Sequence, residues 1–439
     1  MEGYINPNCP YFFSDKMFSL TGVGACEEVG RSGFILDFGE KLLLDYGVKM
    51  SPVGLEYPTD INENIKAIIL SHAHLDHSGY LPYFYKKGNA VSFMTEPTLE
   101  ISDILWQDSL KIADIEGFTP KYSKYDISDT HKHNFLLPYK KEMHITNDLS
   151  LEFFDAGHIL GSSLSKLTYK EKTFVYTGDF KLEETQLHKG ADDVGKIDYL
   201  LIESTYGDRE HPKRKDVEKA LCESVQDTVD NGGFAIIPAF AVGRSQEIVD
   251  ILTSYNVSSD IYLDGMGEKV ANLYLKHSNL IKNPKRLESG LKKAKWVRGP
   301  KDRKDAMKKP CVIVTTSGMM KGGPVVGYVE KMINDPKSKI HLSGYQAEET
   351  PGRMLQDTGK LPYGKDESII KVGCKYEKFD LSAHPGQGEM IKAIKQWSPK
   401  KIFLIHGDKY VMPVFKKKIE DETGIDVDIL KANKKVKFE

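Results

Sequence analysis

Four side chains that commonly bind metal ions crowd into one short segment, SHAHLDHSG at residues 71–79: His72, His74, Asp76 and His77. Burying so many polar groups without a partner would destabilise a folded chain, so we interpret them as ligands. His72 and His74 can point the same way from an extended turn, while Asp76 and His77 can reach a neighbouring position. Because zinc usually takes four ligands, this segment with additions from elsewhere suits two ions about 3.5–4 Å apart.

Three isolated residues are candidates for the additional ligands: His158 in DAGHILGSS, Asp179 in YTGDF and His406 in LIHGD. Each follows an expected strand and adjoins a glycine. An aspartate can bridge two ions with its two oxygens, and Asp179 is the natural bridge. Since zinc lowers the pKa of bound water to about 7, a hydroxide between the ions would be the nucleophile. Taken alone, His158 or His406 is better interpreted as a satisfied polar residue at a strand end.

The length and composition indicate a globular protein of two domains. The chain has 439 residues, 40% of them hydrophobic and 28% charged, with a net charge of −2,. We find no apolar run of transmembrane length and no secretion signal, so we expect no membrane partner. The five cysteines are widely spaced without a C-x-x-C pair, which indicates free thiols and a cytoplasmic location. These are Cys9, Cys26, Cys222, Cys311 and Cys374.

The order of apolar runs predicts one domain inserted into another. Short strands are expected at 41–47, 65–70, 149–154, 172–178 and 199–204, with one amphipathic helix around 78–87,. From about residue 208 the pattern changes to buried strand, glycine loop and helix, which predicts a second α/β unit of parallel strands. Near residue 383 the first pattern returns. We therefore expect a first domain at 1–207, an insert at 208–382 and completion of the first domain by 383–439.

A basic segment lies within the expected insert. Residues 282–309 contain twelve Lys and Arg but only three acidic residues. Such a segment attracts polyanions, and Trp296 within it slightly favours nucleic-acid binding. A solvated, lysine-rich face is the more common meaning of a charge run.

Several motifs in order resemble the β-CASP family, the nucleic-acid-processing branch of the metallo-β-lactamase fold. Besides the four segments above, the chain contains ESTYG (203–207), PAFAVGRSQE (238–247), TTSGMMKGGP (315–324), LSGYQAEETPGR (342–353) and LSAHPGQ (381–387). The resemblance is to the endonuclease subunit of the cleavage and polyadenylation specificity factor and its archaeal and bacterial homologues. It implies an α/β fold: a metallo-β-lactamase αββα sandwich with an inserted β-CASP α/β domain of mainly parallel strands.

The resemblance also implies two zinc ions per chain, bridged by Asp179. The residues implied for one ion are His72, His74 and His158. The residues implied for the other are Asp76, His77 and His406. Manganese stays an alternative, because His/Asp sites accept it as well.

The family's catalytic residues match four positions of this sequence. Asp76 counts among them as well as among the ligands, and Asp45 in LLLDYG would orient ligands or the hydroxide. His384 would protonate the leaving oxygen, and Glu203 would fix its tautomer. Judged from the residues alone, Glu203 is better interpreted as a solvated strand end and His384 as a capping or core histidine.

Four residues of the insert are candidates for substrate binding. Arg244 falls where a strand passes into a helix, which is a plausible phosphate seat. Ser317, Gly318 and Arg353 could add backbone N–H groups and charge. Ordinary turn chemistry is the alternative for each of them.

The resemblance implies a zinc-dependent ribonuclease that cleaves single-stranded RNA, chiefly endonucleolytically, in RNA 3′-end processing or decay. His406 is present, whereas relatives that act on DNA ends lack this histidine. The SAHP sequence differs from the SGHA of 5′-to-3′ exoribonucleases of the ribonuclease J type, which stay an alternative. A non-catalytic RNA-binding subunit and a small-molecule hydrolase are the others. A homodimer or an RNA-processing complex is possible.

Overall fold

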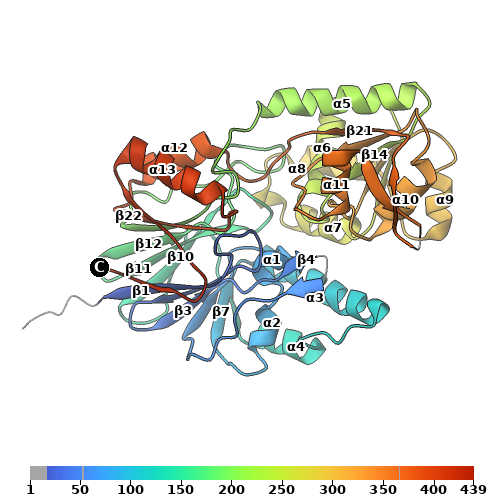
Figure 1. The fold of residues 1–439 in the computed structure, drawn as a ribbon. Coiled ribbons are helices and arrows are strands. Elements are labelled where there is room, and N and C mark those ends of the chain that lie inside the picture. Colours follow the sequence, from blue (N-terminus) through green and yellow to red (C-terminus); the bar gives the residue numbers. More distant parts are fainter. Residues whose placement is uncertain (1–16, 52–53, 365) are drawn as a thin grey trace, which may run out of the picture.

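Two seven-stranded sheets pack face to face, and a third sheet of six strands forms a separate lobe (Figure 1). The computed structural model describes residues 17–51, 54–364 and 366–439, so Cys9 lies outside the described residues. The other four cysteines are free thiols, as the sequence predicted.

The first sheet is built from the N-terminal part of the chain and its last strand. In spatial order its strands are β24 (Lys435–Phe438), β1 (Phe18–Gly24), β2 (Gly33–Asp37), β3 (Lys41–Leu44), β6 (Ala67–Ile69), β7 (Val91–Met94) and β8 (Asn134–Leu136).

The second sheet combines central and C-terminal segments. In spatial order its strands are β23 (Asp426–Ile429), β22 (Lys401–Ile405), β13 (Tyr199–Glu203), β12 (Lys172–Tyr176), β11 (Ser163–Tyr169), β10 (Leu149–Asp155) and β9 (Glu142–His144). The chain leaves the sandwich after β13 and returns at β22, which pairs with β13 in parallel.

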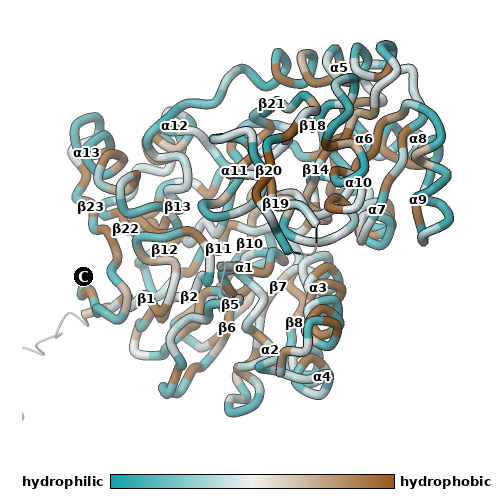
Figure 2. Tube along the Cα trace, turned by 45° about the vertical axis from the view of Figure 1, so that its right-hand side comes forward, coloured by the Kyte–Doolittle hydropathy of each residue, from teal (hydrophilic) through white to brown (hydrophobic). Residues whose placement is uncertain are grey.

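Alternating side chains of the strands explain the layers. Leu42 and Leu44 of β3 are buried between the two sheets, whereas Leu43 is buried on the opposite face, beneath helices,. In β13, Tyr199 and Leu201 face the other sheet, whereas Leu200 and Ile202 face α12 and α13. Both faces of each sheet are thus apolar, and Figure 2 shows hydrophobic residues along β22 and β12.

Helices cover the outer faces of both sheets and complete an αββα sandwich (Figure 1). Those on the first sheet are α1 (Leu75–Ser78), α2 (Leu81–Phe84), α3 (Glu96–Glu116) and α4 (Lys124–Lys132). Those on the second sheet are α12 (Gln387–Trp397) and α13 (Val411–Thr423).

The third sheet consists entirely of parallel strands. In spatial order they are β16 (Lys295–Val297), β15 (Ile261–Asp264), β17 (Val312–Thr315), β14 (Ala235–Pro238), β18 (Lys339–Leu342) and β21 (Lys375–Lys378).

Helices pack on both faces of this sheet, as its parallel strands require. On one face lie α5 (Arg214–Asp230), α6 (Arg244–Ser254), α7 (Gly267–Lys276) and α8 (Pro284–Lys293). On the other lie α10 (Pro324–Met332) and α11 (Pro351–Thr358). Smaller elements are the 3₁₀ turn Ser278–Leu280, α9 (Pro300–Ala306) and the hairpins β4 (Lys49–Ser51)–β5 (Gly54–Glu56) and β19 (Lys360–Tyr363)–β20 (Ser368–Lys371).

The predicted fold class is confirmed: a sandwich of two mixed sheets carries an α/β lobe of parallel strands. One local prediction was wrong, because residues 78–87 do not form a single helix. The chain instead makes two four-residue helices, α1 and α2. Pro82 occupies the first turn of α2, where a missing N–H costs nothing, but it cannot continue a helix from upstream.

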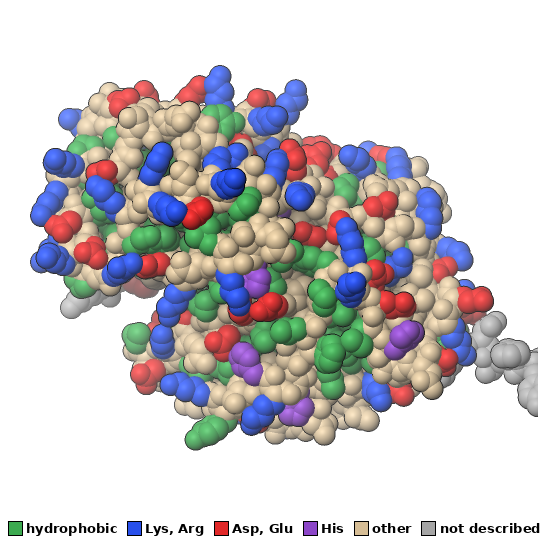
Figure 3. Space-filling view, turned by 180° about the vertical axis from the view of Figure 1, so that it is seen from behind, with side chains coloured by type: hydrophobic (Ala, Val, Ile, Leu, Met, Phe, Trp, Pro, Cys, Tyr) green, Lys and Arg blue, Asp and Glu red, His purple; other side chains and the backbone are tan. Residues whose placement is uncertain are grey.

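The basic segment 282–309 is largely neutralised by ion pairs. Seven of its twelve Lys and Arg side chains pair with carboxylates. Trp296 is partly buried against the apolar cluster of the lobe. On the face shown in Figure 3, acidic and basic side chains are interspersed. A solvated, paired surface is thus the better interpretation of this segment.

Among the described residues, no helix combines the length and the apolar character needed to span a membrane.

Candidate functional site

Loops at the ends of strands from both sheets converge on one cluster of seven His and Asp residues. The SHAHLDH segment follows β6, His158 follows β10, Asp179 follows β12 and His406 follows β22. Potential ligand atoms of these residues form two groups that share Asp179. The first group is His72, His74, His158 and Asp179; the second is Asp76, His77, Asp179 and His406.

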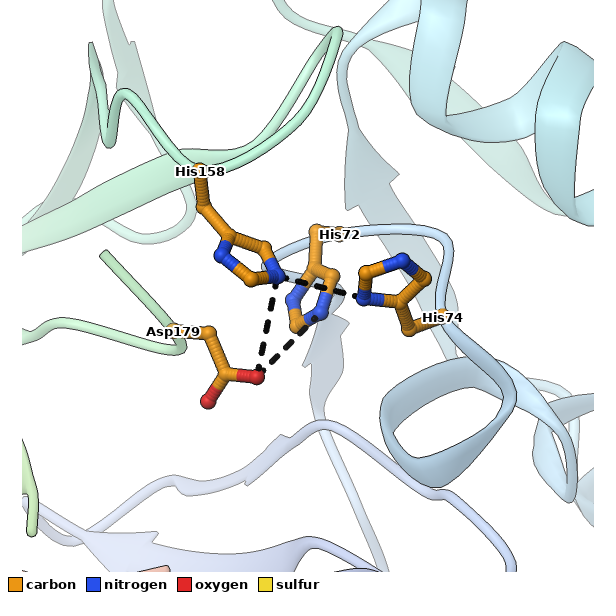
Figure 4. A group of neighbouring side chains, drawn as sticks. All are labelled: His72, His74, His158 and Asp179. Atoms are coloured by element: carbon orange, nitrogen blue, oxygen red, sulfur yellow. Dashed lines mark hydrogen bonds and ion pairs between the residues drawn. The ribbon is translucent and has the colours of Figure 1, made fainter. Parts of the chain in front are cut away.

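The first group surrounds a common point (Figure 4). Nε2 of His158 lies 3.2 Å from Nδ1 of His74 and 3.9 Å from Oδ2 of Asp179. Nε2 of His72 lies 3.7 Å from the same Asp179 oxygen. Three ring nitrogens and a carboxylate thus face one another, as ligands of a single ion would.

The second group uses both oxygens of Asp179. Oδ2 of Asp179 lies 3.3 Å from Nε2 of His77, and Oδ1 lies 3.2 Å from Nδ1 of His406. Nε2 of His406 is 3.4 Å from Oδ2 of Asp76. Asp179 therefore occupies the place between the two groups that a bridging ligand would need.

The burial and protonation of these groups fit divalent cations. In the described part of the chain, His72 Nε2 and Asp179 Oδ1 are buried without a hydrogen-bond partner, which is costly unless a ligand satisfies them,. Burial lowers the pKa of His72 and of His158 well below the usual range, assisted by neighbouring histidines. A lowered pKa favours the neutral ring, the form that binds a metal, whereas the carboxylates of Asp179 and Asp76 outweigh burial and raise the pKa of His77 well above the usual range,.

Asp45 orients His77 from behind. Its carboxylate accepts hydrogen bonds from the backbone N–H of Ser71 at 2.7 Å, from Ser71 Oγ at 2.6 Å and from the Tyr176 hydroxyl at 2.6 Å. Nδ1 of His77 lies 2.6 Å from the same carboxylate and donates to it, which leaves Nε2 to face Asp179. This is the usual arrangement behind a metal-binding histidine.

The loop that carries Asp179 depends on Gly178. Its φ is +51°, and a Cβ at this position would lie 2.5 Å from Cβ of Ser71. The close approach brings Asp179 of one sheet against the SHAHLDH segment of the other, so a larger residue would push the two groups of ligands apart.

His384 and Glu203 form a pair beside this cluster. Nδ1 of His384 lies 3.0 and 2.9 Å from the two oxygens of Glu203, and its Nε2 lies 3.9 Å from Oδ2 of Asp179. Burial opposes protonation of His384, but the carboxylates of Glu203 and Asp179 outweigh it and raise its pKa to about 9. The pair therefore presents an N–H of His384 towards the cluster.

Comparisons with known protein families agree with this architecture. A metallo-beta-lactamase superfamily domain matches residues 35–200, and a Beta-Casp domain matches residues 245–355. A Zn-dependent metallo-hydrolase RNA specificity domain matches residues 369–430.

Similar proteins match over nearly the whole chain. "Probable RNase MJ4" of Methanocaldococcus jannaschii is 38% identical over 94% of this chain and 99% of its own length. "RNase aCSPSF2" of Saccharolobus solfataricus is 33% identical, covering 95% of this chain and 85% of that protein. The chain belongs to the β-CASP family of metallo-β-lactamase-fold ribonucleases.

Other similar proteins carry a different name or share only the fold. "Transcription termination factor FttA" of Methanosarcina mazei is 34% identical over 90% of this chain and 68% of its own length. A crystal structure of a protein of unknown function from Enterococcus faecalis covers 96% of this chain and 100% of that one. Its TM-score is 0.58 at 13% sequence identity, so it supports the fold alone.

The candidate substrate-binding residues of the β-CASP lobe make local contacts. Arg244 at the start of α6 is buried and bonded to Glu247. Ser317 donates to the Lys321 carbonyl at 3.0 Å, and Arg353 binds Asp357 at 2.6 Å. A Cβ at Gly318 would lie 2.9 Å from the backbone nitrogen of Phe240. These contacts favour helix-start and turn roles, and substrate contact stays a prediction.

Two residues that sequence reasoning missed are hydroxyl donors inside the site. Tyr176 binds Asp45, and Thr205 binds Glu203 at 2.6 Å. Both belong to quoted motifs, YTGDF and ESTYG, but a hydroxyl group in a strand or turn carries no sign of its distant partner. The one available signal was their position in the sequence, close to the acidic residue of each motif, Asp179 or Glu203.

Proposed function

We propose that this β-CASP protein is a two-metal, zinc-dependent ribonuclease that hydrolyses phosphodiester bonds of single-stranded RNA. The observation that carries the proposal is the pair of ligand groups sharing Asp179, with the His384–Glu203 pair directly beside them. A metal site beside a positioned proton donor is what hydrolysis of a phosphodiester needs, since an alkoxide must leave.

The residue roles follow from the contacts. His72, His74 and His158 would hold one ion; Asp76, His77 and His406 would hold the other, and Asp179 would bridge them. When bound, divalent ions neutralise negative charge on the phosphate and acidify water. Asp45 would keep Nε2 of His77 directed at its ion. Glu203 would hold the His384 ring, whose Nε2–H would protonate the leaving oxygen.

The exposure of the site indicates where the phosphate would arrive. The side chains of His72, His77, Asp179 and His406 are at most 2% exposed, whereas Asp76 retains 33% and His384 retains 17%. A substrate would therefore approach from the side of Asp76 and His384, which places the leaving oxygen next to the proposed proton donor.

The nature of the substrate is supported by the family. The segment 369–430 matches an RNA specificity domain, and two similar proteins are named ribonucleases. We propose chiefly endonucleolytic cleavage, in RNA 3′-end processing or decay, in the cytoplasm. A homodimer or a larger RNA-processing complex is compatible with it. We also propose domain limits at 1–207, 208–382 and 383–439, since the third sheet takes all its strands from the middle range.

The test is cleavage of a 5′-labelled single-stranded RNA with a structured 5′ end, by the wild type and by His384→Ala. We expect internal cuts by the wild type and a loss in kcat of about 10²–10⁴-fold in the variant, with about two zinc ions per chain in both. His131→Ala is the matched control, because His131 also binds a carboxylate, Asp103, at 2.9 Å but is exposed on α4.

Each other outcome points elsewhere. Mononucleotides released only from an unstructured 5′ end would indicate a 5′-to-3′ exoribonuclease. Bound zinc without cleavage of any RNA would contradict the proposal and favour a binding subunit.

A further inference from the structure

The hydroxyl of Thr205 lies between the proposed proton donor pair and the proposed metal site. Its Oγ1 is 2.6 Å from Oε2 of Glu203 and 3.3 Å from Nδ1 of His406. Thr205 itself is only 5% exposed, so water does not substitute freely for these contacts. The residue has no part in the roles assigned above.

The direction of each hydrogen bond follows from the chemistry of the groups. A threonine hydroxyl has one proton and can also accept. A carboxylate only accepts, so the short contact is a bond donated by Thr205 to Glu203. The oxygen of Thr205 can then accept from Nδ1–H of His406, which also lies 3.2 Å from Oδ1 of Asp179. A continuous chain of hydrogen bonds can thus run from His406 through Thr205 and Glu203 to His384.

Thr205 supplies one of two bonds that fix the Glu203 carboxylate. The other oxygen, Oε1, accepts from the backbone N–H of Phe180 at 3.0 Å. The two bonds hold the carboxylate from both ends, and Nδ1 of His384 approaches both oxygens. Glu203 is fully buried, so loss of either bond would leave a carboxylate oxygen short of a partner, which is costly,.

The sheet places Thr205 against His406. Strands β13 and β22 run in parallel with Glu203 opposite Ile405, and the backbone N–H of Ser204 binds the His406 carbonyl at 3.2 Å. The residues immediately after the two strands therefore lie side by side. This register gives the contact a rigid basis in the fold.

We infer that Thr205 is a positioning residue: its hydroxyl holds Glu203 in place for His384 and links this pair to His406. The inference rests on the proposed function, because it assigns a role within that same site. It predicts that removing the hydroxyl impairs the protonation of a poor leaving group while leaving the metal ligands in place.

Two substrates separate these effects in Thr205→Val, Thr205→Ser and the wild type. RNA expels an alkoxide, which needs a proton, whereas bis(p-nitrophenyl) phosphate expels a nitrophenolate, which does not. We expect Thr205→Val to lower kcat on RNA about 10- to 100-fold with KM changed less than about threefold, and to keep activity on the nitrophenyl diester within about threefold. Thr205→Ser should restore RNA cleavage, because it restores the hydroxyl.

Bound metal and the melting temperature are measured for every variant. Thr130→Val is the matched control, since Thr130 is buried and donates only to the Asp126 carbonyl in α4. Equal RNA cleavage by wild type and Thr205→Val would overturn this inference alone. Equal loss on both substrates, with loss of metal, would overturn it in favour of a role through His406. A wild type that cleaves no RNA would instead refute the proposed function and this role together.

Discussion

Asp45 and His406 hold a left-handed backbone conformation that side chains other than glycine rarely adopt, with φ of 57° and 46°. Each is the first residue after a strand, β3 or β22. The strand fixes the residue before the turn, and the unusual φ of Asp45 or His406 directs its own side chain towards the metal-ligand groups. Such strain persists where the surrounding structure determines it, and it is common at functional sites.

The pKa of Asp155, at the end of β10, predicts how the stability of the protein depends on pH. Burial raises its pKa to about 7, although the N–H of Gly157 donates to its carboxylate at 2.8 Å. The folded protein thus keeps this proton to higher pH than the unfolded chain, which releases it near pH 4. The stability contributed by neutral Asp155 is full below pH 4 and is lost as the pH rises to 7.

We therefore expect the difference in free energy of unfolding between Asp155→Asn and the wild type to depend on pH. From pH 5 to pH 8 it should shift in favour of the variant by about 1–3 kcal/mol. The amide oxygen can still accept from Gly157. Urea unfolding at several pH values checks this. The control is Asp193→Asn, because Asp193 binds the N–H of Gly195 in the same way but is exposed. A difference that stays constant with pH would contradict the prediction.

At the scale of elements, the two segments that join the sandwich to the third sheet are bonded to each other. Nδ1 of His211 lies 3.0 Å from Asp380 Oδ2, and the N–H of Gln387 donates to the Arg209 carbonyl at 2.9 Å. Near the start of α5, Arg214 donates to the Ser382 carbonyl at 3.0 Å. The backbone on both sides of His384 is therefore held by the outgoing segment.

Arg214 is the residue of this connection whose replacement we expect to lower stability the most. Besides Ser382 it binds Glu218 at 3.2 Å and Glu247 at 2.5 Å, and both carboxylates are buried. Arg214→Ala would leave Glu218 without a cationic partner, whereas Glu247 keeps Arg244, so we expect a loss of about 3–5 kcal/mol in the free energy of unfolding,. Chemical denaturation measures it.

The control is Lys219→Ala, which breaks an exposed pair with Glu223 on the same helix and should change stability by less than about 1 kcal/mol,. Similar losses of stability in both variants would refute this account.

At the scale of the whole molecule, the proposed ligands tie the two sheets of the sandwich together but leave the third sheet out. The SHAHLDH segment follows a strand of the first sheet, whereas His158, Asp179 and His406 follow strands of the second. A bound ion would thus cross-link the two sheets. The seven proposed ligands belong to neither apolar cluster of the β-CASP lobe, although the cluster on one face of its sheet also contains Ala73, Ile159 and Leu160 from the ligand loops.

Metal removal should therefore loosen the sandwich more than the lobe. We expect chelation to lower the melting temperature and to speed hydrogen exchange in the loops at 71–79, 156–162, 177–181 and 405–408, but not in β14 or β17. Added zinc or manganese should reverse the change, because an ion that binds only the folded state stabilises it. At a thousand times its Kd, such a ligand contributes about 4 kcal/mol. Equal exchange with and without metal, or faster exchange in β14 as well, would show that these residues do not hold the sheets through an ion.

Runs of apolar residues along the chain predicted the positions of strands, because a strand depends mainly on its own side chains. Apolar runs located strands β3, β6, β10, β12 and β13, because strands that pack between a second sheet and helices carry mostly apolar side chains,. The single helix expected at 78–87 failed because Pro82 starts a new turn there. Trp296 and Arg244 show the limit: sequence marks them as an aromatic and a cation, but whether they face solvent is set by packing.

The sequence by itself determined the fold class and family, because both depend on ordered motifs and apolar runs along the chain. Only the tertiary structure decided which groups meet. Tyr176 binds Asp45 across 131 residues, His384 reaches Glu203 across 181, and His158 lies against the Ala383 carbonyl across 225. The physical reason is that such contacts depend on strand order and register, which bring together the ends of strands that are far apart in the chain.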